Sequence, residues 1–378
     1  MAHIFKGSPQ PTIGVEWELA LVDPDTGDLV GRAAELIEKT PKPHDKVRFD
    51  LEFLDNTVEI VTGVCTNTAE AFEQLQASRA ALDKAAREMG LRLWTSGSHP
   101  TTDFRTQDVS DKPHYKEIIE RTQYWGRQML IWGLHVHVGV KDEDRVWPII
   151  GGLMTLMPVM LAYSASSPAW ISEDTGYASN RSMLYQQLPT AGIPYGFDTW
   201  AEYESFMKDQ ETSGVVSHTG SMHFDIRPAC EHGTIEVRVC DSPATLWEVA
   251  ALTAFIHCAV VYFDSLIDAG EAVPKLPYWH NVENKWRAAR YGDETLMITD
   301  GDTHEATVDV VLEDYLQRFA PIAKDLGCED ELAMMRTLAK VRPGYVRQRE
   351  AFAQHNDWVE VVHHTVDELA SGDVPPRL

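Results

Sequence analysis

Cysteine is scarce in this sequence, and the few cysteines follow no metal-binding or disulfide pattern. The 378 residues include five cysteines, an odd number, and no two of them stand in a C-x-x-C motif. This spacing excludes a zinc ribbon and gives no disulfide framework, so we expect free, buried thiols in a reducing cytosol. The first residues contain no apolar run like that of a signal peptide, and a cytoplasmic location is therefore expected.

Glycine motifs that mark common catalytic or nucleotide-binding sites are also missing. The sequence contains no G-x-x-x-x-G-K-[ST], no G-x-G-x-x-G and no G-x-S-x-G. A P-loop, a dinucleotide-binding turn and the nucleophile elbow of an α/β-hydrolase are thereby excluded. If the protein binds a nucleotide, carboxylate-bound metal ions and arginines must hold its phosphates.

Positive charge is in short supply. Lysine and arginine number 33 against 58 aspartates and glutamates, which gives a net charge of −25. Nucleic acid is not an expected partner, because binding a phosphodiester backbone needs a basic surface. Local arginines and metal ions would have to hold an anionic small-molecule substrate, since the net negative charge of the protein repels it. The sequence leaves the oligomeric state open, including a homo-oligomer.

One long segment lacks charge and resembles a membrane span in hydropathy. Residues 146–172 carry no charged side chain, but proline, glycine and serine interrupt them. We therefore predict a buried helix here, and no membrane partner. Residues 245–269 are predicted to form a second long helix, which is uncharged from Val249 to Phe263 and hence buried in the interior.

The most informative positive feature is a pair of glutamates in a strand-like segment, residues 13–22. Side chains two apart in a strand point to the same face, so Glu16 and Glu18 share one face while Trp17 points to the other. Two adjacent carboxylates repel each other unless a cation lies between them, and Mg²⁺ prefers such oxygen ligands. The alternative is an ordinary acidic strand that faces solvent.

Further strand-like segments repeat this division into an apolar and a polar face. They cover residues 56–62, 131–140, 221–227 and 233–241. Their polar stripes carry residue types that bind metals and phosphate: Glu59; His135 and His137; His223, Asp225 and Arg227; Thr234, Glu236, Arg238 and, as an open case, Cys240. Together the segments predict an α+β fold whose antiparallel sheet has one dry side and one chemical side.

These segments, in this order, resemble the type 2 glutamate–cysteine ligase family, and within it the bacterial ATP-dependent carboxylate–amine ligases. The motifs are GVEWE at 14–18, NTVEIVT at 56–62, GLHVHVG at 133–139, LPTAGIP at 188–194, GTIEVRVCD at 233–241 and NKWRAARYG at 284–292. The resemblance implies a glutamine-synthetase-like catalytic fold, a curved antiparallel sheet with flanking helices whose concave face holds ATP and Mg²⁺. It also implies a single catalytic domain over residues 1–378, with a C-terminal helical part from about residue 300.

The resemblance assigns roles to individual residues. The expected metal or metal–phosphate ligands are Glu16, Glu18, Glu59, His135 and Glu236. Arg238 shares a face with Glu236 and is assigned to the γ-phosphoryl group, so that these two residues form the catalytic pair. His135 and His137 are assigned to the ATP site, where His137 contacts the nucleotide or orients a ligand. One departure is Trp17, where many family members carry an acid.

Other polar residues have two interpretations each. Arg181 is assigned to the carboxylate of the amino-acid substrate, with a structural salt bridge as the alternative. Asp225 and Arg227 could simply pair with each other across strands. A basic cluster in this acidic chain is assigned to ATP phosphate contact, with an exposed helix surface as the alternative: Lys285, Arg287 and Arg290.

The resulting prediction is an ATP- and Mg²⁺-dependent ligase that converts a carboxylate into an acyl phosphate and joins it to an amine. The resemblance implies the γ-carboxyl of glutamate and an amine such as that of cysteine, and it leaves the physiological amine open. A zinc hydrolase built on His135 and His137 is a rival interpretation, but it gives no role to Glu16, Glu18 or Arg238. A second rival is a non-catalytic module that binds ATP without turnover.

Overall fold

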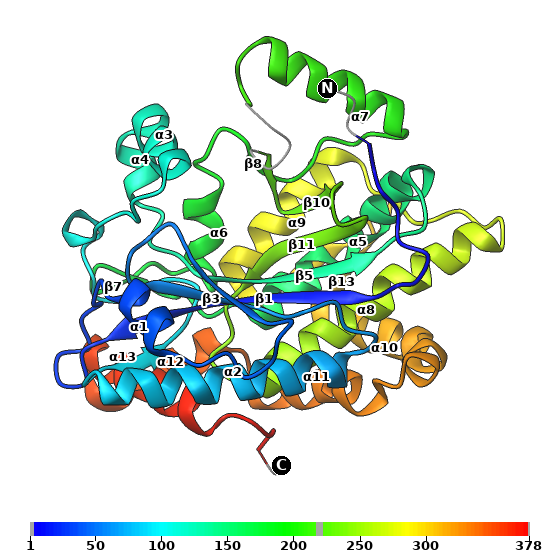
Figure 1. Ribbon diagram of the computed structural model, residues 1–378. Helices are drawn as coiled ribbons and strands as arrows, with labels where there is room; N and C mark the ends of the chain where they lie inside the picture. The colour runs from blue at the N-terminus through cyan, green and yellow to red at the C-terminus, as the bar shows by residue number, and fades with distance from the viewer. Residues whose placement is uncertain (1–3, 217–221, 377–378) are drawn as a thin grey trace.

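An antiparallel seven-stranded sheet forms the centre of the molecule, and helices cover one of its faces (Figure 1). The computed structural model describes residues 4–216 and 222–376, so Ser221, at the start of the predicted strand 221–227, lies outside them. The strand order is β10 (Ile226–Ala229), β11 (Thr234–Asp241), β5 (Gly133–Gly139), β1 (Ile13–Val22), β3 (Thr57–Val61) and β2 (Arg48–Leu51), and β4 (Arg92–Trp94) pairs with the end of β1. The predicted α+β fold with an antiparallel sheet is confirmed.

Long helices pack directly on the apolar face of this sheet. They are α2 (Thr68–Glu88), α5 (Glu143–Ser164) and α8 (Leu246–Asp268). By length and composition α5 and α8 could each cross a membrane, but 94% and 67% of their most apolar windows are buried inside the protein. Their apolar surface on all sides suits helices that lie between a sheet and further helices. The two predicted buried helices are therefore confirmed.

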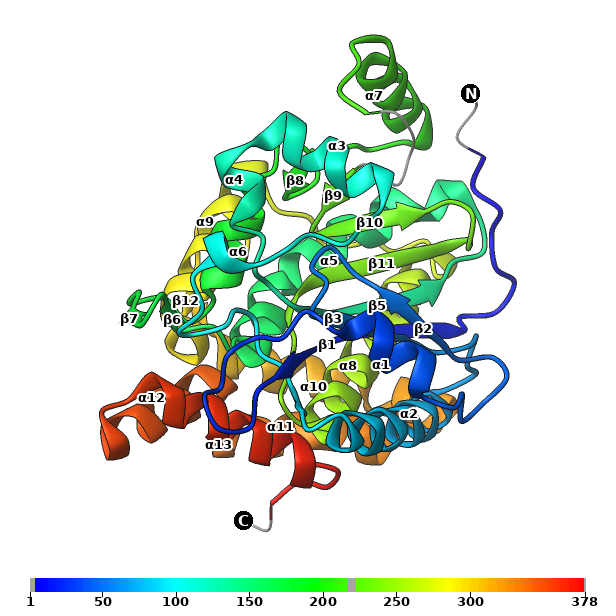
Figure 2. The ribbon, with the colours of Figure 1, turned by 60° about the vertical axis from the view of Figure 1, so that its left-hand side comes forward.

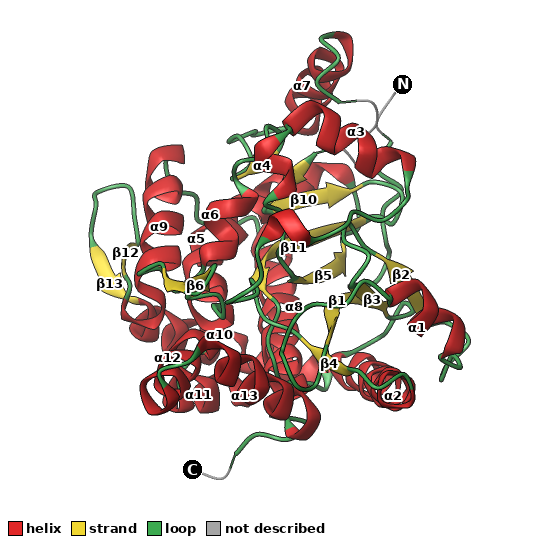
Figure 3. Ribbon diagram, turned by 90° about the vertical axis from the view of Figure 1, so that its left-hand side faces the viewer, coloured by secondary structure: helices red, strands yellow, loops and turns green. Residues whose placement is uncertain are grey.

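The remaining elements surround this two-layer core. Figure 3 shows α11, α12 and α13 on one side of the molecule and α3, α4 and α7 on the opposite side. The helices are α1 (Ala33–Lys39), α3 (Pro113–Thr122), α4 (Tyr124–Arg127), α6 (Asn180–Tyr185), α7 (Trp200–Thr212), α9 (Tyr278–Tyr291), α10 (Val308–Leu326), α11 (Glu329–Val341), α12 (Gly344–His355) and α13 (Trp358–Ser371). Short strand pairs join β6 (Ala169–Trp170) to β7 (Glu173–Asp174), β8 (Ala191–Gly192) to β9 (His223–Phe224), and β12 (Leu296–Ile298) to β13 (Glu305–Thr307).

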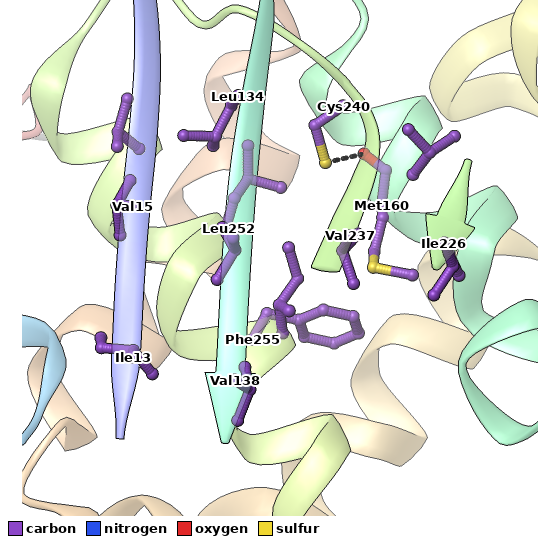
Figure 4. Close-up of a cluster of buried hydrophobic side chains, with 14 of the residues drawn as sticks. Ile13, Val15, Leu134, Val138, Met160, Ile226, Val237, Cys240, Leu252 and Phe255 are labelled. Atoms are coloured by element: carbon purple, nitrogen blue, oxygen red, sulfur yellow. Dashed lines mark hydrogen bonds between the residues drawn. The ribbon is translucent and has the colours of Figure 1, made fainter. Parts of the chain in front are cut away.

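Alternate residues of the central strands build the hydrophobic core. Val15, Leu134 and Val237 come from β1, β5 and β11 and lie together with Leu252 of α8 (Figure 4). Trp17 is fully buried on the same face, and its indole nitrogen donates a hydrogen bond to the carbonyl oxygen of residue 243 at 3.3 Å. The prediction that position 17 faces away from the two glutamates is confirmed.

The polar stripe of β11 is shorter than strict alternation predicts. A β-bulge between Val237 and Cys240 shifts the register, so that Cys240 lies opposite Leu134 of β5. The Cys240 sulfur lies in the core, 4.0 Å from the carbonyl oxygen of Met160 (Figure 4). Cys240 therefore belongs to the apolar face, because the extra residue of a bulge reverses the side to which later residues point.

The predicted strand at 221–227 is broken in two at Asp225. Its first part, β9, pairs in parallel with β8, whereas its second part, β10, belongs to the main sheet. Asp225 forms a 2.6 Å ion pair with Lys285, and Arg227 forms a 2.7 Å ion pair with Glu236. The predictions that the polar residues of this segment share one strand face, and that Asp225 pairs with Arg227, are therefore wrong.

Candidate active site

Cross-strand neighbours bring the acids and histidines of the polar face together. Three pairs lie directly opposite each other: Glu16 and His135, Glu18 and Glu59, and Glu236 and His137. Side chains at such positions start from Cβ atoms only about 5 Å apart. The register that buries the apolar residues of these strands therefore also sets the spacing of the polar groups.

The polar face contains three overlapping groups of metal-ligand side chains. Within each group the ligand atoms all lie within 4.8 Å of one another. The groups are Glu16, His137 and Glu236; Glu16, Glu59 and His135; and Glu18, Glu52 and Glu59. The structure thus brings all five predicted metal ligands together, along with His137. Sets rich in carboxylate suit hard divalent ions such as Mg²⁺.

Glu16 lies between two histidines at the centre of these groups. Its carboxylate oxygens lie 3.0 Å from Nδ1 of His135 and 3.3 Å from Nε2 of His137. Burial by itself would raise the pKa of Glu16, but the hydrogen bonds to both imidazoles lower this pKa below its ordinary value. Burial, together with the nearby Arg238, lowers the pKa of His135 to about 4. His135 is therefore neutral at pH 7, the state in which an imidazole binds a metal.

In the group of Glu18, Glu52 and Glu59 the surroundings favour the protonated carboxyl group, in contrast to Glu16. Burial, reinforced by the charge of Glu52, raises the pKa of Glu18 to about 8. Burial and the neighbouring glutamates also raise the pKa of Glu59 well above its ordinary value. Buried carboxyl groups this close hold protons unless a cation replaces them. The donor set of this group therefore fits a divalent metal ion.

Two arginines flank Glu236 on the same face. Arg227 lies opposite Glu236 in the register, and its Nε donates to the carboxylate at 2.7 Å. Arg238 also forms an ion pair with Glu236, and its Nε donates to the Tyr185 hydroxyl at 3.4 Å. Burial by itself would raise the pKa of Glu236, but the two guanidinium groups lower it well below the ordinary range. The site thus places planar, anion-binding donors next to its metal ligands.

Two pockets adjoin the polar face. The inner pocket has a volume of about 140 Å³, and its polar lining includes Glu18, Glu52, Arg181, His223 and Arg238. The edge pocket has a volume of about 540 Å³, and its polar lining includes Glu16, Lys46, Arg48, His137 and Thr234. The inner pocket is lined by Glu18, Glu52 and His135 and the edge pocket by Glu16 and His137, so each pocket reaches ligands of the metal groups.

Arg181 is a buried cation of the inner pocket with few internal partners. Its side chain is 3% exposed, and its terminal nitrogens donate only to the backbone carbonyl oxygens of Arg238 and Val239, at 3.2 and 3.4 Å. Its guanidinium lies over the ring of Tyr185, 5.5 Å from the centroid. Among the described residues no carboxylate forms an ion pair with Arg181, and its Nε has no hydrogen-bond partner. The predicted alternative, a structural salt bridge, is therefore not observed.

The structure does not bring the basic cluster of α9 into this constellation. Lys285 is buried in its ion pair with Asp225. Arg287 pairs with Glu283 at 2.8 Å and with Glu305 at 2.5 Å. Arg290 donates to the carbonyl oxygen of residue 176 and lies over the ring of Tyr291. Each of the three cations thus has an internal partner, and their contact with phosphate stays a prediction.

Some residues of the site were not identified by the sequence patterns. Glu52 follows β2 directly, and Asp50 and Glu52 stand two apart like Glu16 and Glu18, a signal that could have identified it. The role of Arg227 beside Glu236 depends on which strands pair, and local sequence does not contain that information. The same is true of Tyr185, which lies between the two arginines of the inner pocket.

Comparison with known proteins agrees with this geometry. The family model described as Glutamate-cysteine ligase family 2 matches residues 12–368. The chain is 57% identical over 365 residues to "Putative glutamate--cysteine ligase 2" of Corynebacterium glutamicum (strain R), which covers 97% of both chains. It is 47% identical over 366 residues to a protein of the same name from Mycobacterium ulcerans, which covers 97% of this chain and 93% of the other.

Solved structures show the same fold at low sequence identity. The glutamate–cysteine ligase of Francisella tularensis, crystallised with AMP, has a TM-score of 0.69 at 14% identity and covers 97% of this chain and 90% of its own. A bifunctional glutathione synthetase of Pasteurella multocida has a TM-score of 0.66 at 15% identity, over 96% of this chain and 53% of its own. From the family match and the close relatives, we conclude that the chain belongs to glutamate–cysteine ligase family 2 and is a ligase-type enzyme.

Proposed function

We propose that the protein is an ATP- and Mg²⁺-dependent carboxylate–amine ligase that forms an amide through an acyl phosphate. The carboxylate is expected to be the γ-carboxyl of glutamate, and the amine that of cysteine or a related amino acid. The observation that carries this proposal is the set of metal-ligand groups lying beside two arginines, with members that line each of the two pockets. The names of the close relatives support the same pair of substrates.

The two pockets suggest separate binding sites for the nucleotide and for the amino-acid substrates. The edge pocket, at about 540 Å³, has the size of a nucleotide site, and Lys46 and Arg48 supply positive charge at its wall. The inner pocket, at about 140 Å³, suits an amino acid. We assign ATP to the edge pocket, where His137 contacts it, and the carboxylate and amine to the inner pocket. The AMP bound to the ligase of Francisella tularensis supports a nucleotide as ligand.

Metal ions and arginines overcome the repulsion between a carboxylate and a polyphosphate. Mg²⁺ held by Glu16, Glu18, Glu59, His135 and Glu236 would neutralise phosphate oxygens and orient the γ-phosphate. Arg238 reaches this place from the inner pocket and is assigned to the charge that develops on the transferring phosphoryl group. Arg227 lies on the other side of Glu236 and adds a second guanidinium.

Arg181 is assigned to a carboxylate of the amino-acid substrate. Among the described residues no carboxylate forms an ion pair with its buried guanidinium, although Glu18 and Asp241 attract it at longer range, and a buried charge is costly unless it is paired. We expect Arg181→Lys to raise KM for the carboxylate substrate by at least about tenfold with a smaller effect on kcat, because a lysine loses the planar fork. Arg349→Lys, an arginine outside both pockets, is the matched control.

A screen of amino-acid pairs for ADP release tests the proposal directly. Purified protein with MgATP is given glutamate and other carboxylates, each combined with cysteine and other amines. We expect release that depends on both partners and an amide product detectable by mass spectrometry. If no amino-acid pair stimulates ADP release, the substrate assignment is overturned. If the protein binds ATP but turns over no substrate at all, its assignment as a ligase is overturned. Hydrolysis without ATP and with stoichiometric zinc would establish the rival metal-dependent hydrolase.

A further inference from the structure

Two of the five cysteines lie against each other in the helical layer on the apolar side of the sheet. The Sγ atoms of Cys258 and Cys328 are 3.8 Å apart, and both side chains are fully buried. Cys258 belongs to α8, whereas Cys328 lies 70 positions further along the chain, directly before α11. Figure 2 shows α8, α10 and α11 together in this layer. In the described part of the chain, neither thiol lines the inner or the edge pocket or belongs to a metal-ligand group.

The close approach of two sulfurs is particular to this pair. The sulfurs of Cys65 and Cys240 lie 3.2 and 4.0 Å from the backbone carbonyl oxygens of residues 63 and 160 instead. Among the described residues, Cys258 and Cys328 are the one pair of cysteines that share a hydrogen bond. The sulfurs of a disulfide are about 2.0 Å apart, so these two need to approach by less than 2 Å, which is within reach of small side-chain rotations.

Cys328 lies in the turn between α10 and α11, where the backbone has room to move. Gly327 ends α10 in the left-handed conformation, with φ 64°, and no atom lies within 4 Å of the place that a Cβ would take there. Gly327 and Glu329, on either side of Cys328, are exposed. Cys258 lies in the buried middle of a continuous helix. A small opening of the turn therefore brings Cys328 into contact with solvent while Cys258 stays in place.

The contact also changes the acidity of the two thiols. The hydrogen bond from Cys258 lowers the pKa of the Cys328 thiol, although burial and the charge of Glu331 oppose this effect. The same hydrogen bond, together with burial, raises the pKa of Cys258. Because the thiolate is the form that reacts with oxidants, oxidation should begin at Cys328. Acidity and position in the turn thus favour the same thiol.

We infer that Cys258 and Cys328 are a site of reversible oxidation, which hydrogen peroxide converts into a disulfide. The Cys328 thiolate attacks one peroxide oxygen, a sulfur–oxygen bond forms, the oxygen–oxygen bond breaks, and the leaving hydroxide takes up the thiol's proton. Cys258 then attacks the sulfur of the sulfenic acid, a sulfur–sulfur bond forms, and the sulfenic oxygen leaves as water with the Cys258 proton. In sum, two thiols and one peroxide give one disulfide and two waters. This inference goes beyond the proposed function and does not depend on it.

The disulfide has two consequences for the protein. It closes a loop of 70 residues and ties the start of α11 to α8, which restricts the unfolded chain and stabilises the fold. Helix α8 packs on the sheet through Leu252 and Phe255, so the cross-link reaches the layer that supports the polar face (Figure 4). It also consumes the sulfenic acid of Cys328 before a second oxidant molecule converts it irreversibly into a sulfinic acid.

Peptide mapping of the oxidised, folded protein tests the inference. The wild type is treated with hydrogen peroxide and, in parallel, with the thiol-specific oxidant diamide, because peroxide also oxidises methionine. Remaining thiols are then alkylated in urea. Mass spectrometry should find the Cys258 and Cys328 peptides joined and released by dithiothreitol, whereas Cys65, Cys230 and Cys240 should be alkylated.

Urea unfolding measures the effect of the cross-link. The midpoint of the diamide-treated wild type should rise by about 1 M above that of the reduced protein. Cys258→Ala and Cys328→Ala should show no rise after oxidation, and Cys65→Ala, the matched control, should show the full rise. If one variant of the pair does not fold, the other gives the same comparison.

The outcomes separate the disulfide from other effects of oxidation. Alkylation of both Cys258 and Cys328 after either oxidant, a cross-link to a different cysteine, or a sulfinic acid at Cys328 without a cross-link overturns the inference. An equal rise of the midpoint in Cys258→Ala overturns the stabilising effect, because another modification then causes it. A mapped disulfide without any rise establishes the site and also overturns its effect on stability.

Discussion

Neighbouring residues of β1 lie in two different environments, one on each face of the sheet. Trp17 is fully buried among apolar side chains, and its one polar atom donates to a backbone carbonyl. Glu18 lies beside two further carboxyl groups, and burial raises its pKa to about 8. Packing and one hydrogen bond complete the first environment within the protein. In the second environment the carboxyl groups repel one another unless protons or a cation neutralise them.

This difference shows how one sheet can serve both the fold and the chemistry. Helices α5 and α8 stabilise the sheet from its apolar face, and that stability allows like charges to gather on the polar face. Active sites generally contain such mutually repelling groups, and the rest of the fold offsets the stability that they cost. Substitutions on the two faces should therefore separate into those that change folding and those that change turnover.

The largest effect is expected on the apolar face, at Trp17. Trp17→Ala should lower the free energy of unfolding by about 3–5 kcal/mol, because it removes a fully buried indole and leaves a cavity. Urea unfolding followed by circular dichroism measures this. Trp17→Phe, which keeps an aromatic ring, is the matched control and should cost less. A loss below about 1 kcal/mol for Trp17→Ala would contradict the division between the faces.

On the polar face, Glu236→Gln should affect turnover more than folding. We expect kcat to fall by about two to three orders of magnitude, because the neutral amide holds neither a metal ion nor the two arginines as the carboxylate does. Steady-state ADP release with the substrate pair found in the screen measures this. Glu305→Gln, an exposed acid paired with Arg287, is the matched control and should retain full turnover. Near-wild-type turnover in Glu236→Gln would remove this residue from the site.

The free energy of unfolding of the metal-free protein should depend on pH, because ionised Glu18 is unfavourable on the polar face. The folded pKa of Glu18, about 8, lies above its unfolded value of 4.5, so between these values the folded state binds more protons than the unfolded state. Its contribution to stability is therefore present below pH 4.5 and is lost as pH rises to 8, at up to about 1.4 kcal/mol per pH unit.

Urea unfolding in EDTA at several pH values, with Glu18→Gln as the comparison, isolates this contribution. The variant should lack the decline that the wild type shows. Mg²⁺ should bind the wild type more tightly as pH rises towards 8, since the ion displaces the proton. Parallel curves for wild type and variant would mean that Glu18 does not hold a raised pKa.

The difference between the two faces explains which features of the sheet could be predicted from the sequence. Hydrophobic alternation predicted both faces of β1, β3 and β5, because a sheet with one buried face has a strongly specified register. It failed at Cys240 and at Asp225, where a bulge and a strand break interrupt the period of two. Neither irregularity has a local residue signature, since each depends on how neighbouring strands pair. The partners of Arg227 and Arg181 were inaccessible for the same reason.

Sequence proximity misled most clearly on α9. Lys285 and Arg287 stand two apart, and successive helical residues turn by about 100°, so their side chains point in nearly opposite directions. Lys285 accordingly reaches a buried aspartate, whereas Arg287 reaches acids near the surface. Residues two apart share a face in a strand but not in a helix. The basic cluster of the sequence is therefore not one cluster in space.

The smallest effect should follow from this separation, at Arg287. Arg287→Ala should leave kcat and KM for ATP within about twofold of the wild type, because the side chain is partly exposed and its ion pairs with Glu283 and Glu305 are worth at most about 1 kcal/mol. Arg238→Ala, measured in parallel, should lower kcat by about two orders of magnitude or more. If Arg287→Ala instead raises KM for ATP tenfold, a phosphate contacts α9, and the nucleotide lies outside the edge pocket.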